Sequence, residues 1–220
     1  RGSGGYLEVF RGAAGSIAHS AWIRLPWVAY DYEVGVSHPA MGDMDGDGKE
    51  DLVVGLGAYR SAGGYLAHFV STGAGLSFSR WARVPWSAYN AANGETWPAC
   101  GDVNGDGKAE LVVGLGYHPT DGGWIACFGD RTTGFAFRGW YQAGWNAYNV
   151  VNGQIHPALG DVNGDGRADL LVGMGGGGAG QLSLSLSDGA MFGVANWFQV
   201  PSGAYNTSNG ETWPTLGRTR

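Results

Sequence analysis

Apolar positions along this chain come in short runs that are separated by glycine-rich turns. The clearest run, Leu-Val-Val-Gly-Leu-Gly at residues 111–116, has the continuous apolar character typical of a buried strand. Residues 98–103 precede it, and residues 123–128 and 136–141 follow it after further turns. These four segments predict four short strands in one structural unit, with a long loop leading to the next unit.

The same pattern recurs along the chain with a period of 59 residues. The segment Gly-Asp-x-Asp/Asn-Gly-Asp-Gly at 42–48 returns at 101–107 and at 160–166. A period of this length predicts a tandem array of identical supersecondary units. The units cover about residues 4–62, 63–121, 122–178 and, in part, 179–217 of a single array over residues 1–220.

The predicted fold class is all-β, a β-propeller built of four-stranded antiparallel blades. Four antiparallel strands in roughly 40–60 residues are typical of a propeller blade. One four-stranded sheet cannot bury both of its faces, so the blades must stack on one another. We expect four blades with the terminal one incomplete, because the acidic segment and its following strand occur three times. The array is then either part of a longer chain or a half-ring that closes by self-association.

Composition limits the classes of partner. The chain has 42 glycines without a Gly-X-Y period, and ten Trp, ten Tyr and eight Phe, which excludes collagen and disorder. The net charge is −6 and no basic patch is present, so nucleic acid is not an expected partner. No apolar run approaches the roughly 18 residues of a membrane span. Two cysteines do not make a disulfide framework.

The acidic residues gather in three loops, at 43–51, 102–110 and 161–169. Oxygen ligands at alternate positions of a tight loop converge on one centre, and hard oxygens at this density suit Ca²⁺. Without a cation, so many like charges within nine residues would repel, which disfavours an acidic turn without metal. Three Ca²⁺ sites are therefore predicted. Their ligands are Asp43, Asp45, Asp47, the Lys49 carbonyl and Asp51; Asp102, Asn104, Asp106, the Lys108 carbonyl and Glu110; and Asp161, Asn163, Asp165, the Arg167 carbonyl and Asp169.

The connection between units is long and rich in aromatic residues, as at 85–98. One interpretation is a sugar site between blades, because an aromatic ring stacks on a pyranose and amide or carboxylate groups bind its hydroxyls. The other interpretation is that these residues pack blade against blade, which explains their repetition directly. The candidate ligand-binding residues are Trp86, Tyr89, Asn90, Asn93, Glu95, Trp97, Trp145, Tyr148, Asn152, Gln154, His156, Tyr205, Asn209, Glu211 and Trp213.

No catalytic constellation is found. The histidines form no HExxH pair, and neither a Gly-x-Ser-x-Gly elbow nor a phosphate-binding loop occurs. His38 and His156 stand at the position of Trp97 and Trp213 in the repeat, so they are expected to act as aromatic fillers. An enzyme is not expected.

The segment Gly-Asp-Val-Asn-Gly-Asp-Gly-Lys-Ala-Glu-Leu-Val-Val-Gly-Leu-Gly at 101–116 resembles the FG-GAP/VCBS repeats. These are the calcium-binding blades of integrin α-subunit propellers and of many bacterial extracellular proteins, and propeller lectins built from similar repeats are another relation. The resemblance extends over nearly the whole chain through its period. It implies that each calcium loop joins the first two strands of a blade and lies on the lower face of the ring.

The expected function is that of a calcium-stabilised extracellular binding or adhesion module, of which lectin-like carbohydrate recognition is one form. Loops of this kind are often filled at roughly millimolar calcium, which favours a place outside the cell. Its partners would be calcium and either glycans or a protein. One alternative is a structural scaffold or assembly subunit of a surface layer, filament or larger complex, with no small ligand except calcium. Another is a non-catalytic propeller attached to an enzyme domain.

Overall fold

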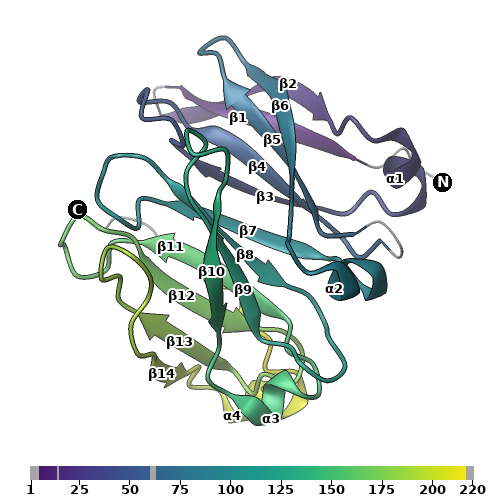
Figure 1. Cartoon of the computed structure of the whole chain (residues 1–220), viewed down its shortest axis with the longest axis vertical. Coiled ribbons are helices and arrows are strands. Elements are labelled where there is room, and N and C mark those ends of the chain that lie inside the picture. The colour runs from purple at the N-terminus through teal and green to yellow at the C-terminus, as the bar shows by residue number, and fades with distance from the viewer. Residues whose placement is uncertain (1–4, 14, 60–62, 217–220) are drawn as a thin grey trace.

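The computed structural model describes residues 5–13, 15–59 and 63–216. Within these residues the chain forms four antiparallel sheets in sequence order, which we call blades 1 to 4 (Figure 1). Blade 1 contains β1 (Tyr6–Ala13) and β2 (Ser16–Arg24). Blade 2 contains β3 (Ser37–Gly42), β4 (Asp51–Leu56), β5 (Tyr65–Ser71) and β6 (Leu76–Arg83). Blade 3 contains β7 (Thr96–Gly101), β8 (Glu110–Leu115), β9 (Trp124–Phe128) and β10 (Phe137–Gln142). Blade 4 contains β11 (Ile155–Gly160), β12 (Asp169–Met174), β13 (Gln181–Ser185) and β14 (Asn196–Gln199).

The predicted all-β architecture of four-stranded blades with an incomplete terminal blade is confirmed. Blades 2, 3 and 4 each have four strands, and blade 1 has two. Blades 1 and 4 lie at opposite ends of an open array (Figure 1). The strands predicted in blade 3 all form, with ends shifted by one or two residues.

Two details of the predicted strand pattern are wrong. The long loop between units contains a short helix in every repeat: α1 (Val28–Glu33), α2 (Ser87–Ala92), α3 (Asn146–Asn149) and α4 (Gly203–Ser208). The partial fourth unit, predicted to extend to about residue 217, should end in the first strand of a further blade, but residues 211–216 form no strand. In blades 2 to 4 the first strand pairs with the second strand of its own sheet, and the described residues after α4 contain no such partner.

One hydrophobic core lies between each pair of neighbouring blades. The second strands β4 and β8 are buried at every position, because both of their faces are covered. In β8, Leu111 and Val113 belong to the core shared with blade 2, whereas Val112 belongs to the core shared with blade 4. This alternation follows from the two-residue period of a strand. The stacking of blades predicted from the repeat is therefore what buries the apolar runs.

The blade topology places two features at opposite ends of each first strand. The first strand follows a helix and ends at an acidic loop, and the loop leads into the second strand. The register is the same in all three complete blades, because Gly42 pairs with Asp51, Gly101 with Glu110 and Gly160 with Asp169. The helices lie along one edge of the array (Figure 1). Among the described residues, no helix is long and apolar enough to cross a membrane.

A threonine at the start of the first strand joins neighbouring blades. Thr96 of blade 3 is fully buried. Its Oγ1 accepts a hydrogen bond from Leu56 N (2.8 Å) and donates to Tyr65 O (3.1 Å), both in blade 2. Thr212 makes the same two contacts with Met174 and Gln181 of blade 4. Ile155 stands at this position in blade 4 and has no hydroxyl.

Replacing Thr96 with Val should lower the free energy of unfolding by about 1–3 kcal/mol, because two buried backbone groups lose their partner. Urea unfolding at equilibrium measures this difference. Ile155→Val is the matched control, since it trims one methylene at the equivalent position and should cost about 1 kcal/mol. Equal losses for the two variants would show that the hydroxyl contributes nothing beyond packing.

Candidate cation sites and aromatic connections

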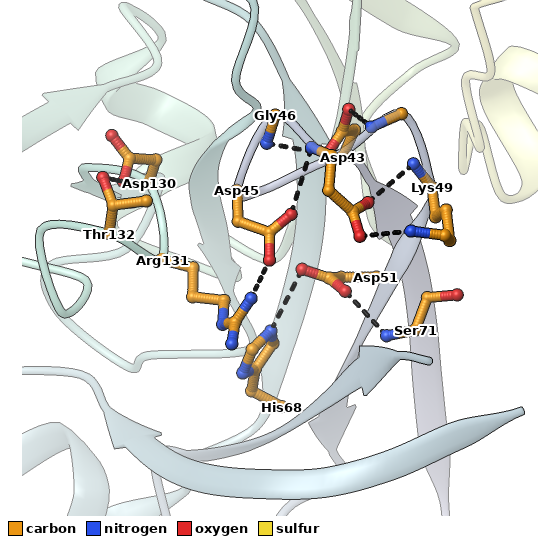
Figure 2. Close-up of polar contacts among 12 residues, drawn as sticks. Asp43, Asp45, Gly46, Lys49, Asp51, His68, Ser71, Asp130, Arg131 and Thr132 are labelled. Carbon is orange, nitrogen blue, oxygen red and sulfur yellow. Dashed lines mark hydrogen bonds and ion pairs between the residues drawn. The ribbon is translucent and has the colours of Figure 1, made fainter. Parts of the chain in front are cut away.

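The first aspartate of each acidic loop organises the turn. In loop 1, Asp43 Oδ1 accepts a hydrogen bond from Gly46 N and Asp43 Oδ2 accepts one from Gly48 N, both at 2.8 Å (Figure 2). Gly46 and Gly48 have φ values of 77° and 81°, which glycine adopts at little cost. Asp102 and Asp161 accept the equivalent bonds at 2.6–2.9 Å. The three loops therefore share one backbone geometry, as their sequence repeat predicts.

The donor set of loop 1 fits a hard divalent cation. Carboxylate oxygens of Asp43, Asp45 and Asp47 lie within 4.8 Å of one another. Ca²⁺ takes six to eight oxygen ligands at roughly 2.3–2.6 Å, so oxygens at this separation are able to share one ion. The loop geometry thus provides an acidic cluster that could hold a metal.

A second acidic cluster is centred on loop 2 and includes a residue that the sequence did not single out. Carboxylate oxygens of Asp106, Glu110 and Asp130 lie within 4.8 Å of one another. Asp130 is buried and follows β9, and its equivalents in the other blades are Ser71 and Ser187. Because the acid occurs at this position in one blade alone, a search for repeated acids could not detect it.

The last acidic residue of each loop is buried and bonded to backbone amides. Asp51 Oδ1 accepts a hydrogen bond from Ser71 N, and Asp169 Oδ1 accepts one from Ser187 N, both at 2.8 Å. Glu110 Oε2 accepts a hydrogen bond from Val103 N at 2.9 Å. Asp51 and Asp169 thus attach their loops to the backbone at or just beyond the end of the third strand, whereas Glu110 binds the backbone of its own loop.

Burial has an electrostatic consequence for these carboxylates. It raises the pKa of Glu110 to about 7 and also raises the pKa of Asp51 above its ordinary value. A bound divalent cation would favour the ionised forms and oppose this effect.

Two of the residues at the predicted carbonyl positions, Lys49 and Arg167, also place their charged side chains against a carboxylate of their own loop. Lys49 Nζ lies 2.5 Å from Asp47 Oδ2, and Arg167 Nη2 lies 2.7 Å from Asp165 Oδ2. The backbone N–H groups of Lys49, Lys108 and Arg167 donate to the fifth-position aspartate at 2.9 Å.

Several residues of the aromatic connections hold the connection together. The Tyr89 hydroxyl donates to Glu95 O (2.5 Å) and accepts from Gly116 N (2.7 Å), and its side chain is fully buried. Asn90 is also buried and donates from Nδ2 to Val84 O at 2.7 Å. Tyr148 repeats the carbonyl contact with Gln154 O (2.5 Å), and Tyr205 repeats it with Glu211 O.

Other residues of the candidate sugar site join one blade to the next. Trp86 lies 4.9 Å from His118 and 6.0 Å from Trp140, between ring centroids. Trp145 lies 6.3 Å from Trp197. Two asparagines bind backbone of the following blade: Asn93 Nδ2 donates to Tyr117 O (3.0 Å), and Asn152 Nδ2 donates to Gly176 O (2.7 Å). The backbone carbonyl of Asn209, which follows α4, accepts from Gly177 N of blade 4 itself (2.8 Å).

A stack of rings forms where the first strands begin. His38 stacks on Trp97 with ring centroids 3.3 Å apart, and His156 stacks on Trp213 at 3.6 Å. Trp97 contacts both His156 and Trp213 edge-on at 4.7 Å, so one cluster runs through blades 2, 3 and 4. Glu95 Oε1 lies 3.3 Å from His38 Nε2. Trp213 is 56% exposed, whereas His156 is buried. The histidines fill aromatic positions as expected.

Stacked four-stranded antiparallel blades, with an acidic loop between the first two strands of each complete blade, define a β-propeller-like repeat protein. The FG-GAP-like repeat family matches residues 43–113, and the FG-GAP repeat family matches residues 156–185. The two matches support an FG-GAP-type repeat protein. A search among curated proteins gave no match.

Proposed function

We propose that this chain is a calcium-stabilised binding or adhesion module that works outside the cell. The observation that carries the proposal is the convergence of Asp43, Asp45 and Asp47 in a loop that the sequence repeats twice more. FG-GAP repeats are generally calcium-binding, and they are typical of extracellular binding and structural modules rather than enzymes. Filling of such loops at roughly millimolar calcium agrees with that location.

Hydrogen bonds between successive loops would transmit the effect of calcium to the stacking of blades. Ala109 N of loop 2 donates to Asp43 O of loop 1 at 2.7 Å, and Ala168 N of loop 3 donates to Asp102 O of loop 2 at 2.6 Å. Each bond joins one blade to the next through a ligand residue. An ion that orders one loop would therefore also order the contact with its neighbour.

Calorimetric titration tests whether the loops are the binding sites. The wild-type chain should bind Ca²⁺ with measurable heat, and the triple variant Asp43→Asn, Asp102→Asn, Asp161→Asn should lose most of that binding, because each site loses a central charged ligand. The triple variant Asp121→Asn, Asp188→Asn, Glu33→Gln is a control for net charge, since it removes three acids outside the loops. If the wild type and the loop variant bind Ca²⁺ with the same heat and affinity, the acidic loops are not the calcium sites.

For the partner, the contacts favour a protein-binding or scaffold role over a sugar site between blades. Tyr89, Asn90 and Tyr148 are buried, and their polar atoms bind backbone groups of the connection. Trp86 and Trp145 are in contact with aromatic rings of the following blade. We therefore propose that the connections stabilise the array and that partners bind elsewhere on it.

A glycan array tests this choice of partner. No glycan should be retained by the wild-type chain in the presence of calcium. Retention that is lost on replacing the exposed Trp213 with Ala, while the far-UV circular dichroism is unchanged, would instead support lectin-like recognition at the ring cluster.

A further inference from the structure

The three acidic loops differ at their third position. Loop 1 has Asp45 there, whereas loops 2 and 3 have Asn104 and Asn163. Loop 1 consequently has four carboxylates at its predicted ligand positions, and loops 2 and 3 have three each. Since the loops share one backbone geometry, the additional charge of Asp45 has to be accommodated by something outside the repeat.

Asn104 and Asn163 show which hydrogen bonds a side chain at the third position of the loop makes. The Oδ1 atoms of Asn104 and Asn163 accept hydrogen bonds from the N–H of the fifth-position aspartate, at 2.8 Å and 2.9 Å. Their Nδ2 atoms donate to a carboxylate of the same loop: Glu110 Oε1 at 2.8 Å in loop 2 and Asp165 Oδ2 at 3.2 Å in loop 3. Asp45 Oδ1 keeps the first contact, with Asp47 N at 3.3 Å. Its Oδ2 has no proton to donate and would only repel the other carboxylates.

An arginine from the neighbouring blade binds this second oxygen. Arg131 lies in the turn between β9 and β10 of blade 3, and its guanidinium forms an ion pair with Asp45 Oδ2 (Figure 2). Arg131 N also donates to Met44 O at 3.2 Å, so both its backbone and its side chain bind loop 1. The pair is only about one-quarter exposed on each side, at 27% and 22%. The equivalent residues of the other blades are Thr72 and Asp188, so the arginine occurs only opposite the loop with the extra acid.

We propose that Arg131 sets the cation affinity of loop 1 by compensating the additional negative charge of Asp45, an inference that rests on the proposed function. Its positive charge offsets the additional carboxylate, so the ligand carboxylates of loop 1 together with Arg131 carry a charge of −3, as the ligand carboxylates of loops 2 and 3 do. The ion pair occupies Asp45 Oδ2 and leaves Oδ1 oriented as in Asn104 and Asn163. Arg131 also makes the loop 1 site depend on the docking of blade 3, because the compensating charge comes from that blade.

Calcium affinity of loop 1 should therefore follow the net charge of the loop with its arginine. Arg131→Gln leaves −4 and should tighten binding at loop 1 about tenfold, and Asp45→Asn leaves −2 and should weaken it about tenfold. The double variant restores −3 and should bind as the wild type does. Lys49→Gln removes a positive charge from the same loop but no contact with blade 3. Comparing its effect on calcium affinity with that of Arg131→Gln therefore separates the effect of charge from the effect of the contact between blades.

Amide resonances of Gly48, Gly107 and Gly166 allow each loop to be followed in one calcium titration by NMR, because each amide donates to the first aspartate of its own loop. The proposal is overturned if Gly107 and Gly166 titrate normally but the Gly48 affinity does not follow the charge order. If none of the three resonances responds, the proposed function itself has failed.

Melting in EDTA tests the ion pair without calcium. Arg131→Gln and Asp45→Asn should each lower the melting temperature, and the double variant should lose less than the sum of the two, because neither charge is then left unpaired. Losses that add would contradict the pairing even if the calcium affinities followed the expected order. Glu33→Gln combined with Asp45→Asn should give additive losses, because Glu33 lies in α1 at the other end of the first strand, and this pair provides the reference for uncoupled residues.

Discussion

Removal of calcium with excess EDTA should lower the melting temperature by roughly 15 °C or more. An ion that binds only the folded chain stabilises it by about 2.7 kcal/mol at a concentration one hundred times its dissociation constant, and three such sites give about 8 kcal/mol. For a chain of this size, each 1 kcal/mol shifts the melting temperature by about 2–4 °C. Differential scanning calorimetry at saturating calcium and in EDTA measures the shift.

The variant with Asp43, Asp102 and Asp161 replaced by Asn provides the control for this experiment. It should melt at nearly the same temperature with calcium and with EDTA, because its loops no longer bind the ion. Re-addition of calcium after chelation should restore the melting temperature of the wild type. A wild-type chain whose melt is unchanged by EDTA would contradict a stabilising role of calcium.

Replacing Gly55 with Ala should cost about 3 kcal/mol of stability. A Cβ at Gly55 would lie 2.1 Å from Thr96 O and 2.6 Å from Pro98 Cδ, both in blade 3. Backbone of the neighbouring blade cannot move aside without separating β4 from β7. In a strand interior without such a contact, Ala is more stabilising than Gly by about 0.5–1 kcal/mol. A loss of stability on Gly55→Ala would therefore come from the contact between blades.

Gly75→Ala is the matched control for Gly55→Ala. Gly75 lies in the turn before β6, and a Cβ there would meet no heavy atom within 4 Å. Urea unfolding should show a loss for Gly55→Ala and almost none for Gly75→Ala. Similar stabilities of the two variants would mean that blades 2 and 3 do not approach each other as closely as the structure shows.

The blades and the acidic loops could be predicted from the sequence because each unit repeats the same order of apolar strand segments and acidic loop. Residues 111–116 form a buried strand in blade 3, and the glycine-aspartate segment before them occupies the same turn in every complete blade. Repetition turns a weak local pattern into a strong one, since three copies with the same spacing are unlike chance. The placement of the loops between first and second strands followed from the same comparison.

The features that sequence reasoning missed are local or unique. The helix α2 is only six residues long, too short for a helical periodicity to appear in the sequence, and its Tyr89 and Asn90 bind backbone groups. Asp130 and Arg131 occur in one blade only, so repetition hides them. Asp130 meets loop 2 within blade 3, whereas the contact of Arg131 with loop 1 depends on how blade 3 stacks on blade 2. Such contacts between blades are tertiary facts without a linear signature.

Native mass spectrometry of the chain after dialysis against calcium tests the central claim most directly, because it counts the ions held by the folded protein. We expect the charge states of the compact chain to show a mass increase that corresponds to three Ca²⁺ ions. Variants that lack the first aspartate of a loop should bind fewer Ca²⁺ ions. A folded chain that carries no calcium under these conditions would contradict it.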